Sequence, residues 1–355
     1  MSTQPLEPGA AFPDSQKSSS DPHFSSDRSF IKRIQHLLHR TPSIVPLLVL
    51  LMAVIGFSIL LGHRFLSPFT LTLVLQQVSV IGVVTVAQTL IILTAGIDLS
   101  VGAIMVLSTV VMGHAVMHYG FPGPLAVGLG LFVGLVCGVI NGWLVANIKL
   151  PPFIVTLGTW QIYLATNYLY SNNESIQFQT LQAKAPALLF LGNTFNVLGA
   201  SLTYGVILMF LLVALFAYAL FKTSWGRYVY AVGDDSESAR LAGVRTKRIL
   251  YSVYILSGLI CALAGWVMIG RVGAVTPQAG ELTNISSITA VVIGGVSLFG
   301  GRGSIYGAFF GGLIVGVFTL GLRMAGFDPQ WTYLLIGALI IVAVMVDQWI
   351  RKVSA

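Results

Sequence analysis

The stretch that decides the fold is Leu71–Leu93, LTLVLQQVSVIGVVTVAQTLIIL, which contains no charged residue. A helix needs about 20 predominantly apolar residues to cross the hydrocarbon core of a bilayer. Working outward from this stretch, we find similar segments on both sides and expect about ten membrane-spanning helices. In chain order the predicted spans are Ile44–Leu61, Leu71–Leu93, Val101–Met117, Leu125–Ala146, Phe153–Tyr170, Leu202–Phe221, Ile249–Ile269, Ile285–Phe299, Ile305–Leu322 and Trp331–Val346.

The composition supports an all-α, polytopic integral membrane protein. The 355 residues are 55% hydrophobic and only 9% charged, and their mean hydropathy is +0.86. Soluble domains carry about 25% charged residues, so a soluble globule of this composition could not cover its surface. The two cysteines, Cys137 and Cys261, lie inside apolar segments and indicate neither a disulfide framework nor a metal site.

The basic residues predict the orientation of the chain. Lys and Arg number 19 and the net charge is +7. With both termini in the cytoplasm, all the basic residues except Arg64, Lys184, Arg271 and Arg323 fall on the cytoplasmic side, as the positive-inside rule requires. The excess of positive charge therefore needs no nucleic acid to explain it.

Three regions follow from these spans. We expect residues 1–43 to form a polar cytoplasmic tail, 44–350 a transmembrane domain, and 351–355 a second short cytoplasmic tail. Within the first tail, Arg28–Arg40 carries apolar and basic residues at helical spacing, which is typical of an amphipathic helix on anionic membrane lipid. The alternative is a disordered basic flank.

The long cytoplasmic loop, residues 222–248, contains a short helix with its own stop signals. Asp234 and Glu237 are spaced as an N-cap residue and its N3 partner, and Gly243 suits the left-handed position that ends a helix. Such a helix suggests contact with a partner, although an ordinary solvated connector remains the alternative. The residues expected to make this contact are Gly233, Asp234, Asp235, Glu237, Ala239, Arg240, Leu241 and Gly243.

Two glycine-rich breaks interrupt the apolar sequence, Thr94–Gly102 and Gly300–Gly307. Each has one charged residue followed two positions later by serine: Asp98 and Ser100, then Arg302 and Ser304. They suggest a weak internal repeat in which spans 2–5 correspond to spans 7–10, an arrangement common in transporters. The alternative is chance recurrence in a chain with 38 glycines.

Asp98 is an ionisable group at membrane depth, where a charge costs at least ~2.5–3.5 kcal/mol on insertion scales. We expect Asp98 or Ser100 to accept hydrogen bonds from the first amides of the third span. Pairing of Asp98 with Arg302 is a further hypothesis.

Neutral polar side chains inside the spans are candidates for a solute pathway. Amides, hydroxyls and an aromatic ring suit an uncharged, polyhydroxylated solute, but interhelical hydrogen bonding explains them equally well. Glycines four apart in spans four and nine predict close helix packing. The candidate pathway residues are Gln77, Gln88, Asn141, Thr156, Thr159, Trp160 and Asn167.

The sequence gives this chain no means of energising transport alone. A phosphate-binding P-loop needs a Gly-Lys pair, which does not occur. No zinc-protease motif occurs either, and His114 and His118, one helical turn apart, have no third ligand nearby in the sequence. We therefore expect no catalytic residue, no bound metal and no enzymatic activity.

Several motifs occur in an order that resembles one family. They are GIDLSVG at Gly96–Gly102, Asn141-Gly142, LPPFIVTLGT at Leu150–Thr159, AVG at Ala231–Gly233 through Gly243-Val244, and VIGG at Val292–Gly295 through Gly303-Ser304. From about Ser58 to the C-terminus, the chain resembles the ribose/xylose/arabinose-type permeases of ATP-binding-cassette importers.

This resemblance implies a homodimer in the inner membrane that imports a monosaccharide such as fructose or ribose. It also implies two cytoplasmic ATP-binding domains, which hold ATP and magnesium, and a periplasmic sugar-binding protein. No cofactor would bind this chain. The loop Gly226–Arg245 would be the coupling helix, and Ser171–Ser201 and Arg271–Asn284 would receive the binding protein. The alternatives are an ion-coupled secondary sugar transporter using Asp98 and a non-transporting scaffold or receptor.

Overall fold

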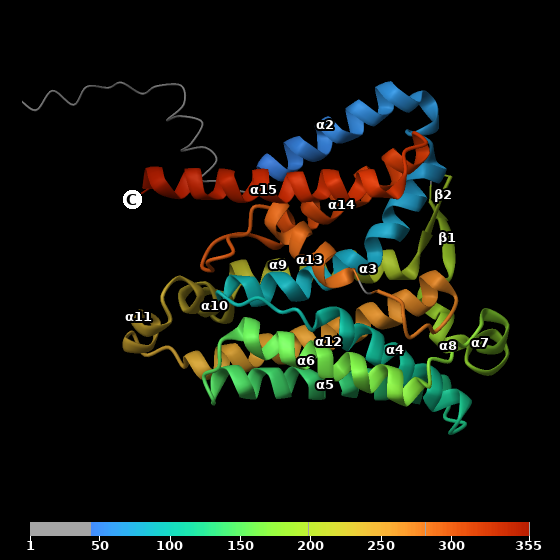
Figure 1. The fold of residues 1–355 in the computed structure, drawn as a ribbon, viewed down its shortest axis with the longest axis horizontal. Coiled ribbons are helices and arrows are strands. Elements are labelled where there is room, and N and C mark those ends of the chain that lie inside the picture. The colour runs from blue at the N-terminus through green and yellow to red at the C-terminus, as the bar shows by residue number, and fades with distance from the viewer. Residues whose placement is uncertain (1–43, 198, 281, 355) are drawn as a thin grey trace, which may run out of the picture.

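A computed structural model describes residues 44–354 except residues 198 and 281 (Figure 1). The predicted amphipathic helix at Arg28–Arg40 lies outside the described residues. The main helices are α2 (Ile44–Leu61), α3 (Pro68–Leu93), α4 (Val101–Met117), α5 (Gly123–Ala146), α6 (Pro152–Ser171), α9 (Tyr204–Lys222), α12 (Thr246–Val272), α13 (Thr283–Ile293), α14 (Ile305–Met324) and α15 (Pro329–Ser354). Each predicted span overlaps one of them.

Shorter elements connect these helices. They are η1 (Gly62–Arg64), α7 (Phe178–Lys184), α8 (Pro186–Leu189), η2 (Phe190–Gly192), β1 (Thr194–Val197), β2 (Ala200–Thr203), α10 (Ser224–Asp234) and α11 (Ser236–Leu241). The expectation of an all-α chain is thus corrected by one antiparallel hairpin, in which Thr194 pairs with Thr203 and Val197 with Ala200.

Within the described part of the chain, six helices are long and apolar enough to cross a membrane, namely α2, α3, α5, α9, α12 and α14. By the same measure α4, α13 and the apolar part of α15 are shorter, so the number of ten spans stays a prediction. The eighth predicted span was drawn too long: α13 ends at Ile293 because Gly294 and Gly295 follow, and Gly295 adopts a φ of 74° that favours glycine.

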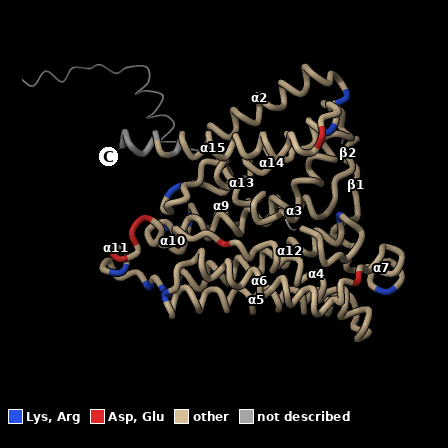
Figure 2. The backbone as a smooth tube through the Cα atoms, viewed as in Figure 1, with Lys and Arg blue, Asp and Glu red and all other residues tan. Residues whose placement is uncertain are grey.

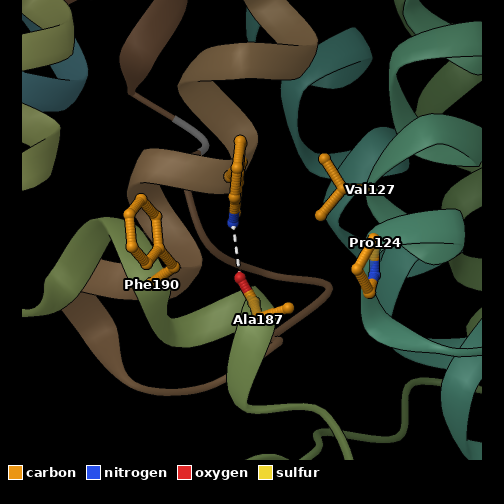
Figure 3. A pocket seen from close by; sticks show the side chains of 5 residues that line it. Pro124, Val127, Ala187 and Phe190 are labelled. Atoms are coloured by element: carbon orange, nitrogen blue, oxygen red, sulfur yellow. Dashed lines mark hydrogen bonds between the residues drawn. The ribbon is translucent and has the colours of Figure 1, made fainter.

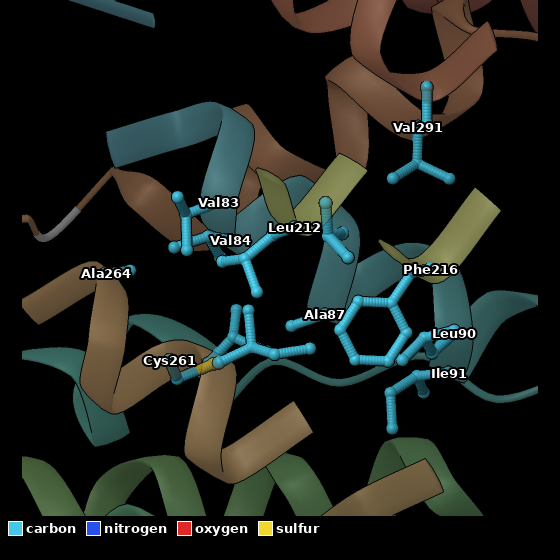
Figure 4. Packing of buried hydrophobic residues seen from close by; sticks show 14 of the residues in the cluster. Val83, Val84, Ala87, Leu90, Ile91, Leu212, Phe216, Cys261, Ala264 and Val291 are labelled. Atoms are coloured by element: carbon cyan, nitrogen blue, oxygen red, sulfur yellow. The ribbon is translucent and has the colours of Figure 1, made fainter. Parts of the chain in front are cut away.

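Helix α3 lies at the centre of the helical assembly. Its residues Val83, Val84 and Ala87 are buried among side chains of α9, α12 and α13 (Figure 4). Leu212 and Phe216 of α9 belong to the same core cluster. A helix that is apolar on all sides is expected to be surrounded by other helices, which explains why Leu71–Leu93 has no polar face.

The glycines of α5 make its close contact with α12. A Cβ atom at Gly134 would collide with the Gly258 carbonyl oxygen, and one at Gly138 would collide with that of Tyr254. On α14, Gly307 and Gly311 face the Gly294 and Ala290 carbonyls in the same way. The packing role predicted for the glycine stripes is confirmed.

The molecule has two distinct ends (Figure 1). The α11 end carries α10 and α11, and the hairpin end carries α7, α8, β1 and β2. Charged residues gather at both ends and are sparse along the helices between them, with a dense group around α10 and α11 (Figure 2). This distribution matches a membrane protein whose middle lies in hydrocarbon.

Candidate coupling site and polar cavity

The predicted cytoplasmic helix exists, but its cap lies one residue later than expected. Helix α10 continues through Asp234, and Asp235 is the N-cap of α11. The Asp235 carboxylate accepts hydrogen bonds from the backbone amides of Glu237, at 2.9 Å, and Ser238, at 3.1 Å. These bonds, together with one from the Ser238 hydroxyl, hold the pKa of the Asp235 carboxyl below its ordinary value.

The end of α11 follows the sequence prediction. Gly243 has a φ of 86°, and its amide donates to the Arg240 carbonyl at 3.0 Å. The Val244 amide donates to the Ala239 carbonyl, also at 3.0 Å. This pair of bonds is the Schellman motif, which satisfies the last carbonyls of a helix.

Helix α11 presents a surface that none of the described residues covers. Glu237 pairs with Arg240, the Nε of which lies 3.1 Å from a carboxylate oxygen, and both side chains are exposed. Leu241, beside them, is 75% exposed. Ala239 instead faces inward and is buried. A single exposed leucine is ordinary on a protein surface, so α11 stays a predicted contact surface, as its place in the charged loop 222–248 suggests.

Behind α11, the end of α10 packs against both glycine-rich breaks. Gly233 leaves no room for a side chain, because a Cβ there would collide with the Leu93 carbonyl oxygen and come within 2.8 Å of the Gly301 amide. The Gly301 amide donates to the Leu93 carbonyl at 3.1 Å, and the Tyr230 hydroxyl donates to the Gly303 carbonyl at 2.8 Å. We call this contact, formed by Leu93, Tyr230, Gly233, Gly301 and Gly303, the coupling junction.

The first break holds Asp98 through neutral groups. One carboxylate oxygen accepts from the Ser100 amide at 2.7 Å and from the Ser100 hydroxyl at 2.6 Å. The hypothesis that Arg302 pairs with Asp98 is wrong: within residues 44–354 as described, the single ion pair is Glu237–Arg240, and Arg302 is exposed. Asp98 also does not cap the first helical amides, because its bonds go to Ser100, the residue before α4.

The two serines of the breaks have different roles. Ser304 caps α14 by accepting the Gly307 amide at 3.0 Å. Ser100 makes no such cap. Its hydroxyl instead accepts a hydrogen bond from the Asn141 side-chain amide at 2.9 Å. The internal repeat stays a prediction, although the structure brings the two breaks together.

Two of the predicted pathway residues hold the first break in place. Asn141 is fully buried and bonds Ser100, and the Tyr163 hydroxyl lies 3.4 Å from its amide oxygen. The Thr156 hydroxyl donates to the Ile97 carbonyl at 3.0 Å. Asn167 has a similar role elsewhere, donating to the Pro277 carbonyl at 2.9 Å. These residues make structural bonds between segments.

The short helix α4 begins beside the first turn of α13. The Gly102 amide donates to the Asn284 side-chain oxygen at 2.6 Å. The first glycine-rich break therefore connects the end of α3, at the α11 end of the molecule, to the start of α4, which lies beside the first turn of α13. Helices that begin within the assembly are typical of transporters.

The remaining predicted pathway residues separate into different environments. Gln88 is fully buried, and neither of its amide atoms has a hydrogen-bond partner within the described part of the chain. Thr159 is buried, and Trp160 is partly buried against the core. Gln77 is the one that lines a polar cavity.

This cavity has a volume of about 470 Å³ and lies between α3, the end of α12, the start of α13, the end of α14 and the start of α15. We call it the polar cavity. Arg271 donates to the Gln77 side-chain oxygen at its edge. From the sequence alone, Arg271 is a basic residue at the start of a loop between spans, and its contact with Gln77 was not predicted because it joins residues 194 positions apart.

A second pocket, of about 340 Å³, lies between α5, α8 and α12 near the hairpin end (Figure 3). Pro124, Val127 and Phe190 line it. The Trp266 indole N–H already donates a hydrogen bond to the Ala187 carbonyl at 3.2 Å. The pocket therefore offers few groups to a polar solute.

Comparison with known proteins identifies the family. Residues 70–344 match the model of the branched-chain amino acid transport system/permease component family. The chain belongs to this permease family. The match confirms the resemblance carried by the sequence motifs, and it makes the permease a multi-pass protein of the inner membrane and a transport component rather than an enzyme.

Individual relatives of the permease are import proteins of several bacteria. The fructose import permease protein of Rhizobium meliloti is 63% identical over 93% of this chain and 91% of its own. The ribose import permease protein of Bacillus subtilis is 36% identical, over 87% of this chain and 93% of its own. The xylose transport system permease protein of Haemophilus influenzae is 29% identical, over 83% and 93%. No solved structure matches.

Proposed function

We propose that this permease is the membrane subunit of an ATP-binding-cassette importer that carries a monosaccharide such as fructose or ribose across the inner membrane. The observation that carries the proposal is the 63% identity to a fructose import permease over 93% of this chain. The ribose and xylose relatives support a monosaccharide in general. None of these names supports the ion-coupled alternative.

The energy comes from a separate ATPase subunit, which binds ATP and magnesium. The absence of any Gly-Lys pair in this chain supports that division of labour. We further propose that two copies of the permease assemble with two cytoplasmic ATP-binding domains. A periplasmic sugar-binding protein delivers the solute to the hairpin end, at Ser171–Ser201 and Arg271–Asn284.

Helix α11 is the surface on which the ATPase acts. Its exposed Leu241 and its caps at both ends support this role. Movement of α11 passes to α10 and, through the coupling junction, to Leu93 at the end of α3 and to Gly303 before α14. Because packed interfaces switch between discrete arrangements rather than deform continuously, the two breaks then move with α10.

The Tyr230→Phe variant tests this route. Phenylalanine fills the same space but cannot donate to the Gly303 carbonyl, so the link between α10 and the second break is weakened. With the full importer in proteoliposomes, we expect sugar uptake per ATP hydrolysed to fall at least threefold. ATP hydrolysis stimulated by the binding protein should stay within twofold of the wild type.

Tyr228→Phe is the matched control, because Tyr228 lies on the same helix and is exposed. It should leave both rates unchanged. Equal transport per ATP in wild type and Tyr230→Phe would remove the coupling junction from the mechanism. Sugar accumulation by the purified permease without any ATPase would refute the proposed function itself.

A further inference from the structure

The polar cavity has the location that a transported solute needs. Gln77 lies on α3 toward the hairpin end, and Ile81, one turn further along α3, lines the cavity deeper in the molecule. Thr283 and Ser286 line it from the first turn of α13. The next residue to Thr283 is Asn284, which binds the start of α4. The cavity therefore reaches the interrupted helices, where transporters of other architectures bind their solutes.

Among the described residues that line the cavity, two strong donors have no charged partner. Arg271 on α12 and Arg323 on α14 both line it, and none of the described residues that line it carries a carboxylate. A guanidinium has five N–H donors in a planar fork, and the Gln77 oxygen accepts from one nitrogen of Arg271. The remaining donors can be satisfied by hydroxyl oxygens of a ligand.

The rest of the lining favours a sugar. The hydroxyls of Thr283, Ser286 and Thr319 can both donate and accept, as sugar hydroxyls do. Apolar side chains such as Ile81 and Val315 also line the cavity and can pack against the C–H face of a sugar ring. A volume of about 470 Å³ is within the range of small-molecule sites.

We propose that the polar cavity is the site at which the permease itself holds the monosaccharide, with Arg271 and Gln77 as the residues that select for its hydroxyl groups. This rests on the proposed function and adds a specific binding site to it. The coupling junction lies at the opposite end of α3, so closure there acts on a solute held here.

A pair of variants on one helix tests the site. Ser286→Phe fills the cavity, whereas Ile285→Phe places the same ring at the neighbouring position, which is exposed and does not line the cavity. In the complete importer with its binding protein, we expect uptake of radiolabelled fructose or ribose to fall at least tenfold in Ser286→Phe and less than twofold in Ile285→Phe. ATP hydrolysis stimulated by the binding protein should stay within twofold in both.

A second variant examines the chemistry without filling the cavity. Arg271→Met keeps the length of the side chain but removes every donor, and a site built to bind hydroxyls loses much of its discrimination without them. We expect uptake at saturating binding protein to fall at least fivefold. Arg271→Lys should recover part of the loss, because lysine keeps the charge but not the planar fork.

The possible outcomes distinguish a failure of the proposed binding site from a failure of the proposed importer function. Unchanged uptake in Ser286→Phe and Arg271→Met would overturn the binding site while leaving the importer intact. Parallel loss of uptake and of stimulated ATP hydrolysis would also overturn it, because the cavity residues would then serve docking or folding. No ATP-dependent uptake of any monosaccharide by the wild type would instead refute the proposed function.

Discussion

Asp98 shows how a single ionisable residue can have a structural role inside a membrane protein. Its side chain is 1% exposed, and its hydrogen bonds come from one neighbour, Ser100. Asn141 extends the same network to α5. A buried carboxylate in a proton pathway is expected to have a relay of further ionisable groups, whereas these partners are neutral.

Replacing Asp98 by asparagine therefore preserves what the residue does. An amide oxygen can accept both bonds from Ser100, so we expect Asp98→Asn to keep at least half of the ATP-driven uptake. Asp98→Ala leaves the buried Ser100 amide without an acceptor, at a cost of about 1–3 kcal/mol, and should lower the thermal stability of the detergent-solubilised protein. A tenfold loss of uptake in a stable Asp98→Asn protein would revive the ion-coupled alternative.

Gly233 is the residue on which the coupling junction depends most. A methyl group there would meet the Leu93 carbonyl backbone, which cannot turn away as a side chain could. We expect Gly233→Ala to destabilise the folded permease by about 1–3 kcal/mol, the usual cost of overpacking, measured by thermal unfolding in detergent. Gly128→Ala is the control, since nothing lies within 4 Å of a Cβ at that helical position; equal stability of the two variants would contradict the crowding.

At the scale of elements, the sequence predicted helices better than their ends. Both ends of α2 and of α4 were predicted to the residue from their predominantly apolar segments. In hydrocarbon a segment forms a helix because its backbone groups must be hydrogen-bonded internally. The end of α13 was missed because apolar residues continue beyond Gly294, and only the positive φ of Gly295 shows the turn. The cap of α11 was misplaced by one residue, since Asp234 and Asp235 are both good N-caps.

The site was only partly predictable for a related reason. Residues that contact each other along one short segment, such as Arg240 and Glu237, follow from helical spacing. The contact of Gln77 with Arg271 and that of Tyr230 with Gly303 join distant parts of the chain. No periodicity in a single sequence encodes such pairs. Asn141 was singled out as a candidate pathway residue, with structural hydrogen bonding as the alternative, and its bond to Ser100 favours that alternative.

Helix α11 leads to a prediction about pH. Hydrogen bonding, first of all from the Ser238 hydroxyl, lowers the pKa of the Asp235 carboxyl. The stabilisation that this N-cap gives α11 is therefore complete above the ordinary pKa of aspartate and is lost as the pH falls through the lowered pKa. Uptake per ATP should therefore not change between about pH 5 and pH 8 through this group. Asp235→Ala should lower uptake per ATP at every pH. Asp235→Asn should not, because the asparagine side-chain oxygen can still accept the hydrogen bonds from both backbone amides. If uptake per ATP by the wild type instead changed with a midpoint between about pH 5 and pH 8, and this change were absent from Asp235→Asn, the predicted pH independence would be wrong.

For the whole molecule, orientation decides which end meets which partner. The α11 end carries Lys149, Lys222, Arg227, Arg240, Arg245, Lys247, Arg248 and Arg302, whereas the hairpin end carries Arg64, Lys184, Arg271 and Arg323. The positive-inside rule assigns the first end to the cytoplasm. With that orientation, we expect the coupling junction at the cytoplasmic end of α3 and the polar cavity on the periplasmic side of it, as the proposed import requires.

Labelling of single cysteines checks this orientation. Lys247 and Lys184 are exposed at opposite ends, and the native Cys137 and Cys261 are buried, so the wild type provides a low background. We expect a membrane-impermeant maleimide to label Lys184→Cys in right-side-out vesicles and Lys247→Cys only in inverted ones. The reverse pattern would place α11 in the periplasm, where no ATPase could reach it, and the coupling proposal would fail together with the orientation.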